Sequence, residues 1–244
     1  MRLERFDVGW MTAPAGVWRQ GEEDPGCPAR VPVPSYLIET DTERILVDTG
    51  LHPVAAEDMV AHYEDETVGV FRTEQEASIA DQVDLASLTR VVLTHLHFDH
   101  VGGLALVPES VPIVIQRAEW DAGHEAAGVE LNFFQPRDYG GQDRDVLLVD
   151  GDHDLLGDGS IELLSTPGHS TGHQSVRVGE IVIGADVAHF AEVLDDPRFP
   201  AFAADFDAQR RSAERLRGLR EDGLTVLPGH DPDVLVPGPV MISG

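Results

Sequence analysis

A cluster of histidines and one aspartate near the middle of the chain constrains its fold more than any other feature. The cluster holds four side chains of metal-binding type within six positions: His95, His97, Asp99 and His100. It directly follows residues 88–93, an apolar run with β-branched side chains, which predicts a buried strand that presents the cluster at its carboxyl end. Burying three imidazoles and a carboxylate together without a cation would be costly. The segment therefore predicts a metal site.

Three later segments repeat this arrangement, in which a strand-like run ends close to a metal-binding side chain. The runs 161–164, 181–184 and 224–227 precede, in that order, His169, Asp186 and His230. Strand ends that lie side by side in a sheet would bring these side chains to one edge. The complete candidate set contains five imidazoles and two carboxylates: His95, His97, Asp99, His100, His169, Asp186 and His230. Seven ligands are enough for two metal ions that share one bridging residue.

The chemistry of this ligand set indicates which ions it binds. Neutral imidazole and carboxylate suit zinc first, with iron, cobalt or manganese as alternatives. Seven ligands over two ions leave open positions for water, which is the pattern of a catalytic site. Two divalent ions with Asp99, Asp186 and a bridging hydroxide would carry a net charge of about +1, which suits an anionic tetrahedral intermediate. The sequence therefore favours hydrolysis.

Composition limits the partners of this chain. Its 244 residues mix strand-like and helical segments without a repeat or a boundary, so we expect one α/β or α+β domain over residues 1–244. The net charge of −27 disfavours nucleic acids and anionic membrane surfaces as partners. No apolar run approaches the roughly 20 residues that span a bilayer, and no secretory leader is evident, so we expect a cytoplasmic protein. A homodimer is left open.

Two segments without a regular pattern carry large apolar side chains. Residues 11–34 are rich in proline and glycine, which predicts an extended loop, and they include Met11 and Trp18. Such residues either line a pocket or anchor the loop to the core. A second irregular stretch, residues 128–145, is long for a connection, and long connections in compact domains often have a function.

The metal motif resembles that of a known family. His-x-His-x-Asp-His from His95 to His100, followed by single His, Asp and His ligands, resembles the metallo-β-lactamase superfamily. Within it the chain is most similar to the N-acyl homoserine lactonases, on the motif and on five further segments: residues 36–40, 45–50, 116–120, 166–175 and 229–231. The resemblance implies an α/β fold, an αβ/βα sandwich of two mixed β-sheets flanked by helices. The metal site would lie at one edge of both sheets.

The resemblance also implies a division of the ligands between two ions. One ion would be held by three histidines: His95, His97 and His169. The other would be held by Asp99, His100 and His230, with Asp186 as the bridge. True β-lactamases of the superfamily use a cysteine ligand, and Cys27 lies too far upstream for that role, so we exclude that activity.

One position departs from the lactonase pattern. These lactonases often have a tyrosine three residues after the bridging aspartate, where it can hydrogen-bond the carbonyl of the substrate. Here that position is His189. A histidine can donate the same bond, but it can equally support a ligand or lie at the surface.

The implied reaction is the opening of a lactone ring, with N-acyl homoserine lactones as the expected substrates and quorum quenching as the expected role. A metal-bridging hydroxide would attack the carbonyl, His189 would help to polarise it, and Asp99 would protonate the leaving alkoxide. The acyl chain would lie against apolar side chains from the loops and the motif: Met11, Trp18, Phe98, Phe133 and Phe134. For each of these taken singly, packing in the core is the simpler interpretation.

Two other functions stay open. An organophosphate triesterase or arylesterase would use the same dinuclear site, because two clamped cations stabilise phosphoryl and acyl transition states alike. A metal-dependent sensor or binding protein without turnover is the alternative from another class. Turnover of simple esters would exclude the sensor, and a comparison of lactone with phosphotriester would separate the two enzymes.

Overall fold

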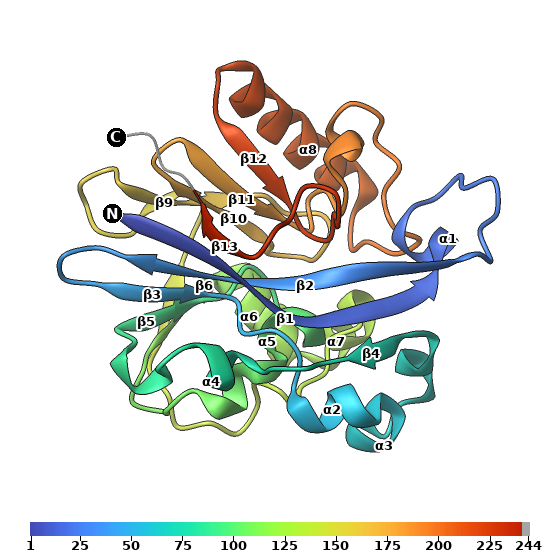
Figure 1. Cartoon of the computed structure of the whole chain (residues 1–244), viewed down its shortest axis with the longest axis horizontal. Coiled ribbons are helices and arrows are strands. Elements are labelled where there is room, and N and C mark those ends of the chain that lie inside the picture. The colour runs from blue at the N-terminus through green and yellow to red at the C-terminus, as the bar shows by residue number, and fades with distance from the viewer. Residues whose placement is uncertain (241–244) are drawn as a thin grey trace.

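Two β-sheets pack face to face, and helices cover the outer face of each sheet (Figure 1). This arrangement is seen in a computed structural model, which describes residues 1–240. The first sheet has eight strands in the order β13-β1-β2-β3-β5-β6-β7, with β4 paired to β1, and the second has five in the order β12-β11-β10-β9-β8. Both sheets contain parallel and antiparallel pairs. The implied αβ/βα sandwich of two mixed sheets is confirmed.

The bounds of the strands follow the chain from the first sheet into the second. Those of the first sheet are β1 (Arg2–Pro14), β2 (Pro28–Glu39), β3 (Arg44–Val47), β4 (Arg72–Glu74), β5 (Arg90–Val92), β6 (Ile113–Gln116), β7 (Val146–Val149) and β13 (Gly238–Val240). Those of the second sheet are β8 (His153–Asp154), β9 (Ile161–Ser165), β10 (Gln174–Val178), β11 (Ile181–Ala185) and β12 (Thr225–Pro228).

The helices are short, apart from the last. The α-helices are α1 (Ala15–Trp18), α2 (Pro53–Glu57), α3 (Met59–Tyr63), α4 (Ile79–Gln82), α5 (Phe98–Val101), α6 (Arg117–His124), α7 (Ala126–Asn132) and α8 (Phe206–Glu221). Single 3-10 turns are η1 (Glu66–Val70), η2 (Leu85–Ser87), η3 (Gly102–Leu106) and η4 (Ala191–Leu194). Among residues 1–240, none of these helices has both the length and the apolar character that crossing a bilayer requires.

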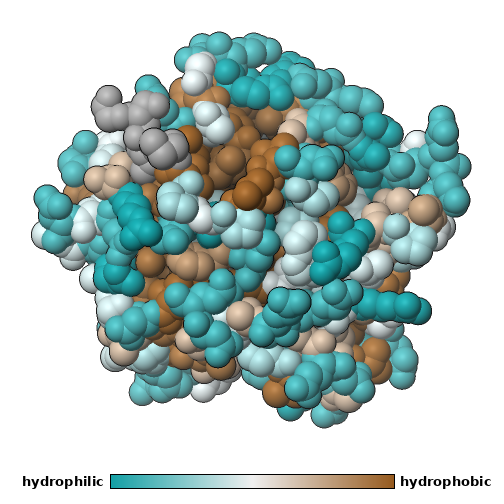
Figure 2. Space-filling view, viewed as in Figure 1, coloured by the Kyte–Doolittle hydropathy of each residue, from teal (hydrophilic) through white to brown (hydrophobic). Residues whose placement is uncertain are grey.

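Alternating apolar side chains hold the layers together. Ile45 and Val47 of β3 face Ile161 and Leu163 of β9 in one cluster between the two sheets. The opposite face of the first sheet packs against the helices that follow β3 and β5, and α8 covers the outer face of the second sheet. Hydrophilic residues cover much of the face in Figure 2, and apolar residues show mainly over the strands. Burial of these faces supplies the main free energy of folding.

The prediction of a loop over residues 11–34 was wrong for most of its length. Strand β1 continues to Pro14, and β2 begins at Pro28, so the two form a long antiparallel hairpin closed by α1 (Figure 1). The prolines of β2 escape the usual penalty because Pro28, Pro32 and Pro34 share one parity, and alternate residues direct their backbone groups to opposite sides. The carbonyl of Pro32 accepts from His230, so the backbone groups of these prolines face away from β1, and β3 on that side pairs only with residues 36–39.

The four ligand-bearing segments follow strands that end at one edge of the sandwich. In the first sheet β3, β5, β6 and β7 run parallel to one another. In the second sheet β11 and β12 are parallel, and β9 runs in their direction because both β9 and β11 are antiparallel to β10. Gln174 joins the sheets here, donating through its backbone N–H to Thr94 and through its side chain to the carbonyl of Leu93. The carboxyl ends of β5, β9, β11 and β12 therefore meet.

The segment after α6, expected to be irregular from residue 128, stays helical to Asn132, and only residues 133–145 form a loop.

A buried carboxylate in this loop supports the helical layer beneath the ligand-bearing edge. In that loop Asp138 is 1% exposed and accepts a hydrogen bond from the hydroxyl of Tyr63 at 2.9 Å. Burial raises the pKa of Asp138 to about 7, although Tyr63 and Arg137 oppose the shift. The ring of Tyr63 lies beside Phe98 of the metal motif, with 6.1 Å between the ring centroids.

We expect Asp138→Asn to stabilise the protein at alkaline pH. Because the pKa of Asp138 is raised on folding, its favourable contribution is complete below about pH 4 and is lost as the pH rises through about 7. Asparagine keeps the acceptor for Tyr63 without a charge. The free energy of unfolding at about pH 8.5 should rise by roughly 4 kcal/mol, and the gain should vanish near pH 4, as measured by urea titration. The same substitution at exposed Asp143 is the control, and an equal gain there would contradict the assignment.

Candidate metal centre

The first four candidate ligands come from the segment between β5 and η3. His95 and His97 lie in the extended residues after β5, and the short helix α5 turns Asp99 and His100 to the same side. The glycines that end the motif are required by close packing, because a Cβ on Gly103 would lie 2.3 Å from the carbonyl oxygen of Thr49. The tight approach holds the motif against the loop that follows β3.

One group of ligand atoms is formed by three imidazoles and a carboxylate. His95 Nε2 and His169 Nε2 each lie 2.9 Å from His97 Nδ1. Asp186 Oδ2 lies 3.3 Å from His169 Nε2 and 3.9 Å from His95 Nε2. All four side chains are buried, and their ligand atoms lie within 4.8 Å of one another.

The second group adjoins the first through the same carboxylate. His230 Nε2 lies 3.4 Å from Asp99 Oδ2, and His100 Nε2 lies 3.6 Å from the same atom. The second oxygen of Asp186, Oδ1, lies 3.3 Å from His230 Nε2 and 3.4 Å from His100 Nε2. The structure therefore brings all seven predicted ligands together, with Asp186 between the two groups.

For three of the five ligand histidines, a hydrogen bond at the outer edge of the ring decides which nitrogen faces inward. His97 Nε2–H donates to the carbonyl of Asn132 at 2.7 Å, and His230 Nδ1–H donates to that of Pro32 at 2.8 Å. His100 Nδ1–H donates to Asp48 Oδ2 at 2.7 Å. The other nitrogen of each neutral ring then carries its lone pair toward the centre, as a metal ligand requires.

Thr94 completes the support for this arrangement. Its hydroxyl donates to Asp48 Oδ2 at 2.7 Å, so its oxygen is free to accept from His95 Nδ1 at 3.0 Å. Asp48 also accepts from the backbone N–H of Thr94 at 2.7 Å. Asp48 therefore has two roles, because it holds His100 and also makes the turn at the end of β3, with a left-handed φ of 58°.

The converging lone pairs fit divalent cations. The pairing of His95 and His97 described above leaves a lone pair on His95 Nε2 and on His97 Nδ1, which lie 2.9 Å apart, and within residues 1–240 His100 Nε2 and Asp186 Oδ1 have no hydrogen-bond partner. Acceptors that face one another repel unless a positive charge lies between them. In a tetrahedral site with metal–nitrogen bonds of about 2.1 Å, ligand atoms lie about 3.4 Å apart, which is close to the spacings here.

The electrostatics of the groups agree with this fit. Burial holds the pKa of His95 and of His169 well below the ordinary value, so both rings stay neutral. Burial lowers the pKa of His100 and of His230, but the carboxylates of Asp186 and Asp99 outweigh it and raise both. The positive charges on these two rings in turn hold the pKa of the Asp186 carboxyl well below its usual range, although burial opposes its ionisation. A metal ion bound here would displace these protons and supply the same positive charge. Neutral imidazole and ionised carboxylate are the forms that bind a metal ion.

Several residues that position the ligands were missed at the level of sequence. Glu119, which is fully buried, accepts from the backbone N–H of Leu96 at 3.1 Å and from that of Gly172 at 2.6 Å, so it ties together two ligand-bearing segments. Burial raises the pKa of Glu119 to about 7. Asn132 does similar work, because its side-chain oxygen accepts from the N–H of Thr171 at 2.8 Å. Their partners come from distant segments, so no local pattern identifies them.

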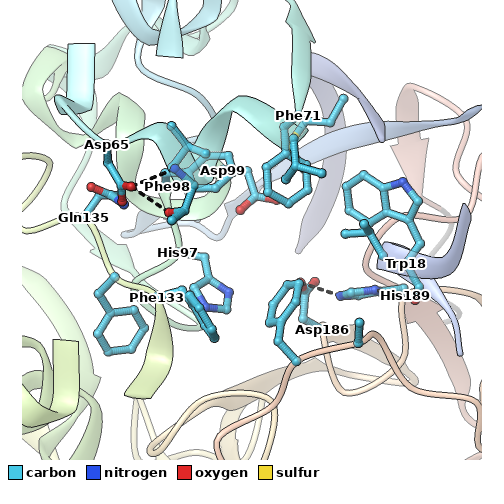
Figure 3. Close-up of a pocket in the computed structure, with 18 of the residues that line it drawn as sticks. Trp18, Asp65, Phe71, His97, Phe98, Asp99, Phe133, Gln135, Asp186 and His189 are labelled. Carbon is cyan, nitrogen blue, oxygen red and sulfur yellow. Dashed lines mark hydrogen bonds and ion pairs between the residues drawn. The ribbon is translucent and has the colours of Figure 1, made fainter. Parts of the chain in front are cut away.

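A cavity of about 470 Å³ opens directly onto the ligand cluster, and Figure 3 shows its lining. His97, Asp99, Asp186, His189 and His230 form its polar floor. All five apolar residues singled out from the sequence line it: Met11, Trp18, Phe98, Phe133 and Phe134. Phe71 and Phe202 also line the cavity, and they were missed because they lie in irregular segments without a motif.

Two further histidines contact Asp186. His189 is 2% exposed, and its Nε2 lies 3.0 Å from Asp186 Oδ2. His173 is fully buried, and its Nε2 accepts from the backbone N–H of Asp186 at 3.2 Å, which identifies it as a support for the bridging residue.

Sequence comparisons identify relatives over most of the chain. The profile of the metallo-beta-lactamase superfamily matches residues 28–230. N-acyl homoserine lactonase AttM of Azorhizobium caulinodans is 31% identical over 230 residues, which cover 85% of this chain and 85% of that protein. An N-acyl homoserine lactonase of Bacillus cereus is 30% identical over 225 residues, covering 85% and 84% of the two chains.

Solved structures share the fold. An N-acyl homoserine lactone hydrolase with the product N-hexanoyl-L-homoserine at its metal centre matches with a TM-score of 0.82 and 24% identity, over 95% of this chain and 94% of that one. AidC, a dizinc quorum-quenching lactonase, matches with a TM-score of 0.67 and 17% identity, over 97% and 92% of the chains. The fold, the ligand cluster and the profile agree, and this chain belongs to the metallo-β-lactamase superfamily.

Proposed function

We propose that this protein is a metal-dependent hydrolase that opens the ring of N-acyl homoserine lactones. The observation that carries the proposal is the ligand cluster on the floor of a largely apolar cavity. The polar head of such a lactone suits the floor, and its acyl chain suits the aromatic walls. Relatives that are 30–31% identical over 85% of this chain bear the name N-acyl homoserine lactonase.

The seven clustered side chains would hold two divalent ions, and we propose zinc. One ion would bind to His95, His97 and His169, the other to Asp99, His100 and His230, with Asp186 shared between them. When bound, two such cations would lower the pKa of a coordinated water and polarise the carbonyl of the substrate.

The remaining steps concern the chain itself. In the reaction, water adds to the lactone carbonyl carbon, the ring carbon–oxygen bond breaks, and the leaving alkoxide takes up a proton. Asp99 lines the cavity and would carry that proton to the alkoxide. Phe98, Phe133 and Phe202 would hold the acyl chain and exclude water from the walls of the cavity. Water would then reach the lactone only at the floor, beside the ligand cluster.

An assay of ring opening tests the proposed function. We expect the zinc-loaded protein to open N-acyl homoserine lactones, with release of acid that a pH indicator measures. Activity should disappear after treatment with a chelator and return when zinc is added. Under the same conditions, hydrolysis of a phosphotriester should be slower than lactone opening. If the protein opens no lactone with zinc, cobalt, iron or manganese, or prefers the phosphotriester, the proposal is wrong.

We expect Asp48→Asn to weaken metal binding without unfolding the protein. Asparagine tolerates the left-handed backbone at this position, but its amide N–H group would face His100 Nδ1. The ring would then carry its proton on Nε2, the atom that faces Asp186. Loss of such a support typically lowers metal affinity about 10–100-fold.

Zinc competition with a chromophoric chelator measures the affinity. Asp41→Asn, in the exposed turn between β2 and β3, is the matched control and should bind zinc like the unmodified protein. An Asp48→Asn protein with two zinc sites of unchanged affinity would refute the role given to Asp48.

A further inference from the structure

His189 is held in the cluster by backbone pairing with a ligand segment. The N–H of His230 donates to the carbonyl of His189 at 2.8 Å, and the N–H of Gly229 donates to that of Ala188 at 3.0 Å. A Cβ on Gly229 would lie 2.3 Å from Asp186 Oδ1, so this residue must be small for the segments to approach. The two histidines therefore project from adjoining backbones toward the same carboxylate.

The ring of His189 is oriented as those of the proposed ligands are. Its Nδ1 faces the carbonyl of Trp18 at 3.3 Å, and its Nε2 faces Asp186 Oδ2 at 3.0 Å (Figure 3). His230 shows the same arrangement, with Nδ1 on the carbonyl of Pro32 and Nε2 at 3.3 Å from both oxygens of Asp186. A neutral ring that donates from Nδ1 directs the lone pair of Nε2 at the carboxylate.

We propose that His189 is a metal ligand, which shares one ion with Asp186 and His230. The ligand atoms of these three buried side chains lie within 4.8 Å of one another. In the tautomer that donates from Nδ1 to Trp18, the lone pair of His189 Nε2 would repel the ionised carboxylate, and a cation among them would relieve that repulsion. This inference rests on the proposed two-ion site and extends its ligand set from seven residues to eight.

Packing around the ring favours this role over hydrogen bonding to the substrate. A donor to a substrate carbonyl needs a proton on Nε2 that points into the cavity, but His189, although it lines the cavity, directs Nε2 at Asp186. The indole of Trp18 packs against one edge of the ring at a centroid distance of 5.9 Å, and the rings of His169 and His230 lie at 5.4 and 5.1 Å. Three rings and the Trp18 carbonyl thus fix the orientation of His189.

Coordination by His189 would make the protein hold the ion more tightly. An ion bound by one more protein nitrogen keeps fewer positions for water and leaves the protein more slowly. Tyrosine, which the resemblance to lactonases leads one to expect here, offers a neutral phenol, a much poorer ligand. We therefore expect the histidine to raise the affinity of the more weakly held ion.

The test measures metal binding in the full-length chain. His189→Ala, His189→Tyr and the unmodified protein are titrated with zinc against a chromophoric chelator, and each is loaded with Co²⁺ for visible absorption spectra. We expect the unmodified protein to bind two ions and both variants to lose at least about tenfold in affinity for one of them. The Co²⁺ spectrum of that site should change as well. His124→Ala, on the exposed end of α6, is the control and should match the unmodified protein.

The outcomes separate this inference from the proposed function. If His189→Ala binds both ions with unchanged affinity and an unchanged Co²⁺ spectrum, His189 is not a ligand. If His189→Tyr keeps both affinities and full lactone opening, His189 acts as a hydrogen-bond donor to the substrate and the inference is wrong. If the unmodified protein binds fewer than two ions, the proposed two-ion function fails first, and the inference fails with it. Two variants are used in case one of them misfolds, and circular dichroism shows whether each variant is folded.

Discussion

The structure depends on the approach of buried lone pairs toward a common centre. His95 Nε2 and His169 Nε2 each lie 2.9 Å from His97 Nδ1, and the carboxylate of Asp186 lies beside them. Such an arrangement is unfavourable in a protein interior unless cations occupy the centre. Other features around it oppose that repulsion, since Asp48, Asn132 and the Pro32 carbonyl each fix one ring from behind.

The fold supplies these supports from both sheets. Ligands follow strands β5, β9, β11 and β12, so the cluster joins two layers that meet elsewhere mainly through apolar contacts. The proline-rich hairpin contributes as well. At Pro32 the strand gives up a backbone donor that no neighbour needs and presents a carbonyl to His230. A proline-rich segment whose composition predicts a loop therefore forms an ordered strand next to the site.

Features that depend on residues close together in the sequence were predicted, and features that depend on distant segments were missed. Strands β9, β11 and β12 depend on local patterns of apolar residues, and they were predicted. The hairpin β1–β2 was missed because proline fits in a strand when its nitrogen lies on the unpaired side, and the sequence does not show which side is unpaired. Glu119 was missed because its two partners lie in segments far from it along the chain.

The sequence by itself determined the seven candidate ligands and the fold family, because ligand chemistry and strand patterns are local properties of the chain. Only the tertiary structure decided which ring nitrogen of His97, His100 and His230 faces the centre, since the deciding hydrogen bonds come from other segments. It also decided the surroundings of His189. From the sequence this residue was a donor to substrate, a support or a surface residue, and packing against Trp18 and His230 turned it toward Asp186.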